Sequence, residues 1–90
     1  MTGKAVILSD HARRQAARRG IDDAAALGVA AAPEQVVPVR SGREIRQARN
    51  EEPGSRRQHL VRVVVDLGPD VDTVITVYRT SKTAKYWRTP

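Results

Sequence analysis

The sequence predicts an α+β domain in which an N-terminal strand and two helices pack on a three- to four-stranded antiparallel sheet. Up to Pro33 the chain carries alanine-rich segments of helical character. After Pro33, β-branched residues alternate with polar ones, and turn residues interrupt them. Helices that precede a run of antiparallel strands are typical of α+β folds. A length of 90 residues predicts a single domain over 1–90.

The chain begins with a predicted strand and a first helix. Residues 5–8 are a short apolar run, typical of an edge or first strand. Ser9 or Asp10 then caps a helix that continues through Arg19, and Gly20 ends it.

A second helix follows, with Asp22 as its expected N-cap and Pro33 after its end. Residues 24–31 are apolar nearly all round, which predicts a buried helix, although Gly28 weakens it.

The middle of the chain contains an edge strand and a less regular stretch. Residues 36–39 are β-branched, but Pro38 confines this strand to the edge of a sheet. Residues 41–42 are a turn signal. Residues 43–50 are a strand with two polar faces or a loop, and residues 51–55 are a turn or loop.

The last third predicts a hairpin and a tail. Residues 58–67 form the strongest strand, residues 68–70 turn the chain, and residues 73–80 pair back. Residues 82–87 are a basic and aromatic tail. His59 opens the main strand in register with its valines, which indicates a structural histidine.

Alternation divides the last predicted strand into two faces. Ile75 and Val77 fall on one face, which we expect in the core. Thr76, Tyr78 and Thr80 fall on the other and predict a surface of hydroxyl groups.

The charge balance predicts attraction to polyanions. Lys and Arg number 16 against 10 Asp and Glu, for a net charge of +6 and a pI near 10.8. A merely soluble, arginine-rich surface is the alternative. The sequence has no cysteine, no run long enough to cross a bilayer and no signal peptide, so we expect a cytoplasmic protein. Metal-ligand spacings and nucleotide fingerprints are missing too, so we expect neither metal nor cofactor.

The first helix gathers groups suited to phosphate chemistry. His11, Arg14, Gln15 and Arg18 share an arc of about 100° on a helical projection. Guanidinium groups bind phosphate, and a histidine moves a proton near neutral pH. The alternative is the solvated face of an amphipathic helix.

The basic tail predicts contacts with single-stranded RNA. Arg79, Lys82 and Lys85 supply cations for phosphates, while Tyr86 and Trp87 supply rings for bases. The alternative has the two rings covering one end of the core.

Three segments carry a family resemblance: Ser9-Asp10-His11, Arg19-Gly20-Ile21, and residues 74–82 followed by Lys85-Tyr86. They resemble a small bacterial and phage domain of uncharacterised function, with an S-x-H-x-x-x-R-x-x-x-R-G-I start and a final strand ending in T-x-Y or a close variant. That domain is similar to the RelE-like and barnase-like ribonuclease toxins.

The resemblance implies metal-independent RNA cleavage, with His11 catalytic, Arg19 on phosphate, and Thr80 and Tyr86 near the scissile group. Gln15 stands where the family pattern has its first Arg, and the neighbouring Arg14 is the expected substitute.

The sequence therefore predicts a toxin-type endoribonuclease, in which the ribose 2′-hydroxyl attacks the adjacent phosphate. RNA is the expected partner, together with a cognate antitoxin protein. The predicted cations are Arg14, Arg18, Arg19, Arg79, Lys82 and Lys85. A non-catalytic RNA- or DNA-binding module with the same basic face is the first alternative, and a structural accessory protein is the second.

Overall fold

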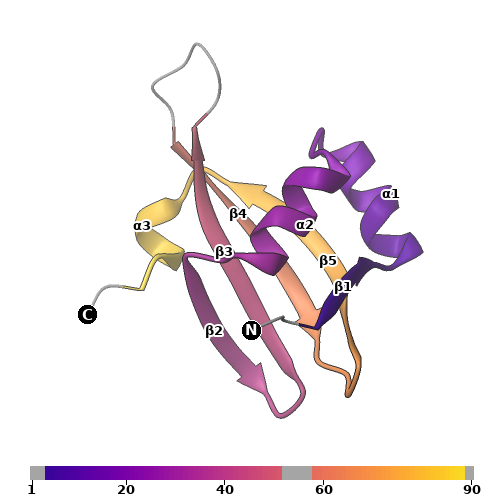
Figure 1. Ribbon diagram of the computed structural model, residues 1–90. Helices are drawn as coiled ribbons and strands as arrows, with labels where there is room; N and C mark the ends of the chain where they lie inside the picture. Colours follow the sequence, from indigo (N-terminus) through magenta and orange to yellow (C-terminus); the bar gives the residue numbers. More distant parts are fainter. Residues whose placement is uncertain (1–3, 52–57, 89–90) are drawn as a thin grey trace.

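The computed structural model describes residues 4–51 and 58–88 as a five-stranded sheet with three helices (Figure 1). The elements in chain order are β1 Ala5–Leu8, α1 Asp10–Arg18, α2 Asp23–Ala31, β2 Gln35–Arg40, β3 Arg43–Glu51, β4 Gln58–Asp66, β5 Val71–Thr80 and α3 Thr83–Tyr86. Among the described residues, no helix is long and apolar enough to cross a membrane.

The strands lie in the order β1-β5-β4-β3-β2. β2 to β5 form an antiparallel series, whereas β1 pairs with β5 in parallel, from Ala5 beside Val71 to Leu8 beside Val74. The α+β prediction is confirmed in outline. Two details differ from the prediction. The N-terminal strand joins the four antiparallel strands as a fifth, parallel strand beside β5, and a third helix, α3, follows β5 in the predicted tail.

The predicted ends of α1 are confirmed. The Ser9 hydroxyl accepts a hydrogen bond from the Ala12 N–H at 3.0 Å, which satisfies one free donor of the first turn. Gly20, with φ +67°, reverses the chain after the helix. The Ile21 N–H then bonds the Ala16 carbonyl at 2.8 Å.

α2 begins after Asp22 as predicted, but the expectation that it is buried all round is wrong. Only Ala26 and Ala30 are buried, while Ala24, Ala25 and Ala31 face solvent. In a two-layer fold, a surface helix needs only one face against the sheet. Alanine tolerates this exposure because it carries little apolar surface.

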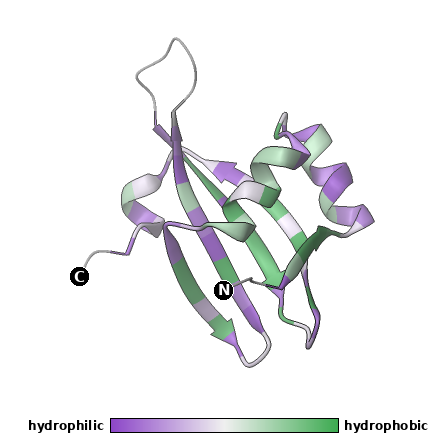
Figure 2. Cartoon of the chain, viewed as in Figure 1, coloured by the Kyte–Doolittle hydropathy of each residue, from purple (hydrophilic) through white to green (hydrophobic). Residues whose placement is uncertain are grey.

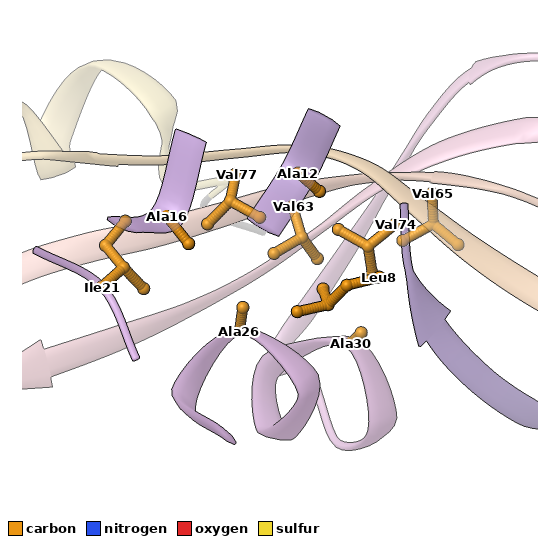
Figure 3. Close-up of a cluster of buried hydrophobic side chains, with 10 residues drawn as sticks. All are labelled: Leu8, Ala12, Ala16, Ile21, Ala26, Ala30, Val63, Val65, Val74 and Val77. Atoms are coloured by element: carbon orange, nitrogen blue, oxygen red, sulfur yellow. The ribbon is translucent and has the colours of Figure 1, made fainter. Parts of the chain in front are cut away.

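The hydrophobic core lies between these two helices and the sheet (Figure 3). It consists of Leu8, Ala12, Ala16, Ile21, Ala26, Ala30, Val63, Val65, Val74 and Val77. Each helix contributes two alanines four positions apart, so the pair lies on one face. Small side chains let the helix backbone approach the sheet closely, which suits a core filled by valines.

The less regular middle of the chain forms strands. β2 is an edge strand, as Pro38 predicted, and the stretch over 43–50 is the strand β3 between β2 and β4. Two paired neighbours explain how such a polar segment stays extended. Residues 52–57, which include most of the predicted loop after β3, lie outside the described residues.

A β-bulge changes the faces of β5. The pairing shifts between Val64 and Val65, so that Val74 and Val77 are both fully buried although they are three positions apart. Ile75, which simple alternation places in the core, is only partly buried. The predicted polar face of Thr76, Tyr78 and Thr80 survives because it lies beyond the bulge.

An ionic cluster around the buried Asp72 joins β3, β5, α2 and Lys4, the residue before β1. Asp72, 4% exposed, contacts Lys4 at 2.8 Å and Arg46 at 2.9 Å. Arg46 also contacts Glu44 at 2.7 Å and donates to the Ala30 carbonyl at the end of α2, at 2.8 Å. Burial alone would raise the pKa of Asp72, but the hydrogen bonds from Lys4 and Arg46 outweigh it and lower this pKa.

Because its pKa is lowered in the folded state, Asp72 stabilises the fold above the ordinary aspartate range, and this contribution is lost as the pH falls through the lowered value. We expect Asp72→Asn to reduce the free energy of unfolding at pH 7 by about 2 kcal/mol, since hydrogen bonds to a charged group are lost. The variant should also depend less on pH below about 4 than the natural chain. Urea unfolding at pH 7 and pH 3 measures both effects. Asp66→Asn, in the more exposed Arg43 pair, is the matched control and should change little.

Candidate functional site

The outer edge of β5 is open over its second half. β1 is four residues long and covers β5 only from Val71 to Val74, whereas β5 continues to Thr80. α1 satisfies the exposed backbone at Val77. Gln15 Oε1 accepts from the Val77 N–H at 3.0 Å, and Arg19 Nη1 donates to the Val77 carbonyl at 2.6 Å. These two side chains thus satisfy the Val77 N–H and carbonyl, which a neighbouring strand would otherwise bond.

The same helical stripe contains His11. His11, Gln15 and Arg19 follow one another at intervals of four, so they lie along one side of the helix. Because Gln15 and Arg19 contact β5, His11 lies one turn earlier along the same edge. His11 is exposed, as predicted, but Gln15 is buried, so its place on the exposed arc was wrong.

Arg14 and Arg18 complete the predicted arc on the solvent side of α1. Both are exposed, and α1 is coloured hydrophilic on its outward side (Figure 2). They are in position to attract an anion, but no ion pair to a carboxylate is recorded for either among the residues described.

The Arg19-Gly20-Ile21 segment has a structural explanation. Arg19 bonds the β5 edge, Gly20 takes the left-handed conformation, and Ile21 returns to the core at 7% exposure. Arg79 Nη2 donates to the Arg19 carbonyl at 3.1 Å and so ties this turn to β5. The turn fixes where the Arg19 guanidinium lies.

An open cavity of about 590 Å³ lies at this edge, lined by Arg19, Thr76, Tyr78 and Arg79. Two guanidinium groups supply positive charge, and the threonine and tyrosine supply hydroxyls. Such a set can bind a phosphate and exchange a proton with it.

Arg62 of β4 lies behind the cavity and is only 6% exposed. Its Nη1 donates to the Tyr78 hydroxyl, and its Nε donates to Gln47 Oε1 at 2.8 Å. The Tyr86 ring covers its guanidinium, 4.3 Å from the ring centroid. Strand alternation puts Arg62 opposite the buried Val61 and Val63, so this cluster and α3 lie on the sheet face away from α1 and α2.

The arginines of the sheet, together with Arg19 at the end of α1, form two groups that differ in their binding partners. Arg43, Arg46 and Arg49 form ion pairs with carboxylates, and the hydrogen bond from Arg49 lowers the pKa of Glu34. By contrast, the set near the cavity makes no carboxylate pair among the described residues; it comprises Arg19, Arg62 and Arg79. Positive charge therefore remains available at the β4–β5 side of the sheet.

The C-terminal tail lies over the same face. The Tyr86 ring stacks on Arg62, and Arg49 lies over the Trp87 ring at 4.3 Å. Gln47 Nε2 donates to the Tyr86 carbonyl at 3.1 Å. Both rings are partly exposed and each lies against an arginine, so the tail combines cations with aromatic rings.

The structure brings some predicted site residues together and separates others. Arg19 and Arg79 share the cavity. Thr80 ends β5 beyond the cavity, Lys82 lies just before α3, and Lys85 and Tyr86 lie in α3. The lysines are exposed, and the Lys82 N–H bonds the Thr80 hydroxyl at 3.1 Å. His11, Arg14 and Arg18 lie instead on α1, on the other side of the β5 edge.

Sequence reasoning missed Arg62, Gln47 and the role of Tyr78. A signal for Arg62 was available, because it interrupts a run of apolar residues in β4. A charged residue at such a position requires partners on one sheet face. Its contact with Tyr78 depends on the β4–β5 register, which pairs these two residues.

One comparison decides the family. The model of a family described as Domain of unknown function (DUF4258) matches residues 8–79. The chain belongs to this family. No curated protein and no solved structure matches the chain. The DUF4258 match contains the α1 stripe, Arg62 and the cavity residues, whereas α3 and Tyr86 lie beyond it.

Substitution can test whether Gln15 of α1 covers the outer edge of β5. We expect Gln15→Ala to destabilise the DUF4258 domain by about 1–3 kcal/mol, because the Val77 N–H loses its acceptor. Arg14→Ala, on the solvent side of the same helix, should change the free energy of unfolding by less than about 0.5 kcal/mol. Urea unfolding compares the two variants. Equal losses would show that Gln15 does not seal the edge.

Proposed function

We propose that this domain is a metal-independent endoribonuclease that cleaves RNA by attack of a ribose 2′-hydroxyl on the adjacent phosphate. The observation that carries the proposal is the group of arginines without carboxylate partners around Tyr78: Arg19, Arg62 and Arg79. Natural proteins rarely bury a cation such as Arg62 without an acidic partner, because desolvation is costly. A polyanionic substrate would supply the missing negative charge.

The chemistry needs cations, a base that accepts a proton and an acid that donates one. Cations must stabilise the charge that develops on the phosphate, and Arg19 and Arg79 are placed to do so. A base must accept the 2′-hydroxyl proton, and His11 on the β5 edge is our candidate. Thr80 and Tyr86 remain proposed members of the site at the far end of β5, where Tyr86 can also stack on a base.

The resemblance to RelE-like and barnase-like toxins supports the same proposal. Those domains also carry helices against a curved antiparallel sheet. On this reading the domain acts in the cytoplasm, RNA is the substrate, and a cognate antitoxin protein is its second partner.

A non-catalytic RNA- or DNA-binding module is the second candidate. It is favoured by the position of His11 on α1, whereas Tyr86 lies on the opposite face of the sheet. Binding needs only cations and rings on one surface, which Arg49 with Trp87 and Arg62 with Tyr86 provide. Cleavage separates the two candidates.

We expect the purified chain to cleave single-stranded RNA in the presence of EDTA and to leave a cyclic phosphate and a 5′-hydroxyl. His11→Ala should slow cleavage by about 10²-fold or more, as loss of an acid–base group does. Tyr86→Ala should also slow cleavage, because Arg62 loses the ring that covers its guanidinium. The double variant should lose less than the product of the two single losses, since residues of one site act together. Gel assays of an end-labelled RNA measure these rates.

The contradicting result is RNA binding without cleavage, or cleavage that survives in both single variants. Binding without cleavage would put the binding module in first place. Circular dichroism of every variant shows whether the fold is retained.

Binding itself should depend strongly on salt. If three or four phosphates contact Lys and Arg, the plot of log affinity against log salt should have a slope of about −2 to −3 for single-stranded RNA. Arg79→Ala should make this slope shallower by about the contribution of one phosphate contact. Arg40→Ala, at the exposed end of β2, is the control that should leave it unchanged. Fluorescence anisotropy from 50 to 300 mM KCl (~sixfold) covers the range that the counterion effect requires; a flat plot would contradict phosphate binding.

A further inference from the structure

We propose that Tyr78 is the general acid of this site and protonates the 5′-oxygen that leaves the phosphate. This inference rests on the proposed ribonuclease function and assigns one of its two proton-transfer roles. Tyr78 is distinguished from the other hydroxyl residues of the sheet face by a combination of two features: it lines the open cavity beside Arg19 and Arg79, and its hydroxyl accepts a hydrogen bond from the buried Arg62.

The hydrogen bond from Arg62 determines where the Tyr78 proton can go. A guanidinium group has donors and no acceptor, so Arg62 occupies a lone pair of the phenol oxygen and leaves the proton unused. Within the described part of the chain, no residue accepts that proton. Because no described residue accepts this proton, we assign it to a ligand of the cavity that Tyr78 lines together with Arg19 and Arg79.

The same hydrogen bond stabilises the product of proton transfer. When the phenol gives up its proton, negative charge develops on the oxygen that Arg62 contacts. Because Arg62 is buried and no carboxylate among the described residues competes for it, its charge acts on that oxygen with little screening. Gln47 Oε1 and the Tyr86 ring hold the guanidinium in place, so the donor needs no rearrangement.

Tyr86 has a different relation to the same cation. Its ring lies flat against Arg62 at 4.3 Å, and its backbone carbonyl is bonded by Gln47. The Tyr86 hydroxyl has no hydrogen bond to Arg62 among the described contacts. Tyr86 is thus a positioning residue for Arg62, whereas Tyr78 presents its oxygen to the charge.

The proton balance of the step is complete. The 2′-oxygen forms a bond to phosphorus and its proton passes to the base, for which His11 is the candidate. The bond between phosphorus and the 5′-oxygen breaks, and the Tyr78 proton passes to that oxygen. The products are a 2′,3′-cyclic phosphate and a 5′-hydroxyl, and water then returns a proton from the base to the tyrosinate.

The test uses two substrates that differ only in their need for an acid. An RNA dinucleotide has an alkoxide leaving group that must be protonated, whereas a uridine 3′-(4-nitrophenyl phosphate) releases a nitrophenolate that needs no proton. We expect Tyr78→Phe to slow cleavage of the dinucleotide by about 10²- to 10⁴-fold. Release of nitrophenolate should slow by less than about tenfold, because the cavity and its cations are kept. His11→Ala should slow both substrates, since both need a base.

An equal loss on both substrates, or no loss on either, would overturn the role of Tyr78 as general acid. The natural chain would still cleave RNA in those cases, so the proposed function would stand. If the natural chain cleaves neither substrate, the proposed function fails and the role of Tyr78 fails with it. A variant that misfolds would lose both activities together with its urea unfolding transition, and Tyr78→Trp, which keeps an aromatic ring without the hydroxyl, then repeats the comparison.

Discussion

The mismatch in length between β1 and β5 is the constraint on which the rest of the structure depends. β1 ends at Leu8, and β5 continues six residues beyond the pairing, so half of its outer edge has no strand beside it. An unpaired edge invites association with other chains unless it is covered. α1 covers it with side chains, and this requirement fixes the helix against β5. The alanines of the helix, the turn at Gly20 and the position of Arg19 all follow from it.

The arginines with carboxylate partners and those without such partners lie on different strands of the sheet. The arginines of β3 are neutralised by carboxylates and connect β3 to α2, to the neighbouring β4, to β5 and to Glu34 just before β2. Those near the β4–β5 edge bind carbonyls, hydroxyls and rings, which leave their charge intact. Arg62 of β4 and Arg79 of β5 therefore keep their positive charge without a carboxylate partner among the described residues. Arg19 combines a structural contact with a place in the cavity, because it bonds the Val77 carbonyl at the β5 edge and also lines the cavity.

Local signals in the sequence predict most of the secondary structure. Ser9 and Gly20 define α1 because capping and left-handed turns depend on neighbouring residues alone. Pro38 places β2 at an edge because it lacks a donor. Long-range pairing is not encoded locally, so neither the parallel partner of β1 nor the bulge at Val64 could be predicted.

The residue types of the candidate site could be predicted from the sequence, but their positions relative to one another could be predicted only in part. The hydroxyl face of β5 followed from alternation, and His11 was correctly placed on the exposed side of a helix. Gln15 was misplaced because a polar residue on an amphipathic helix was assumed to face solvent. Gln15 instead accepts a hydrogen bond from the unpaired Val77 N–H at the strand edge, and this contact depends on how α1 packs on β5. Arg62 was missed because its partners, Gln47 and Tyr78, come from two other strands.

The parallel pairing of β1 with β5 also sets the order in which the molecule can assemble. Its partners come from opposite ends of the chain, from Ala5 beside Val71 to Leu8 beside Val74. Closing so long a loop is slow, and during synthesis the N-terminal helix emerges well before the strand that it covers. The apolar stripe of α1 then has no sheet to pack on until β5 has been made. The covered edge of β5 consequently forms among the last events of folding, because α1 and β1 cannot dock before β5 has been synthesised.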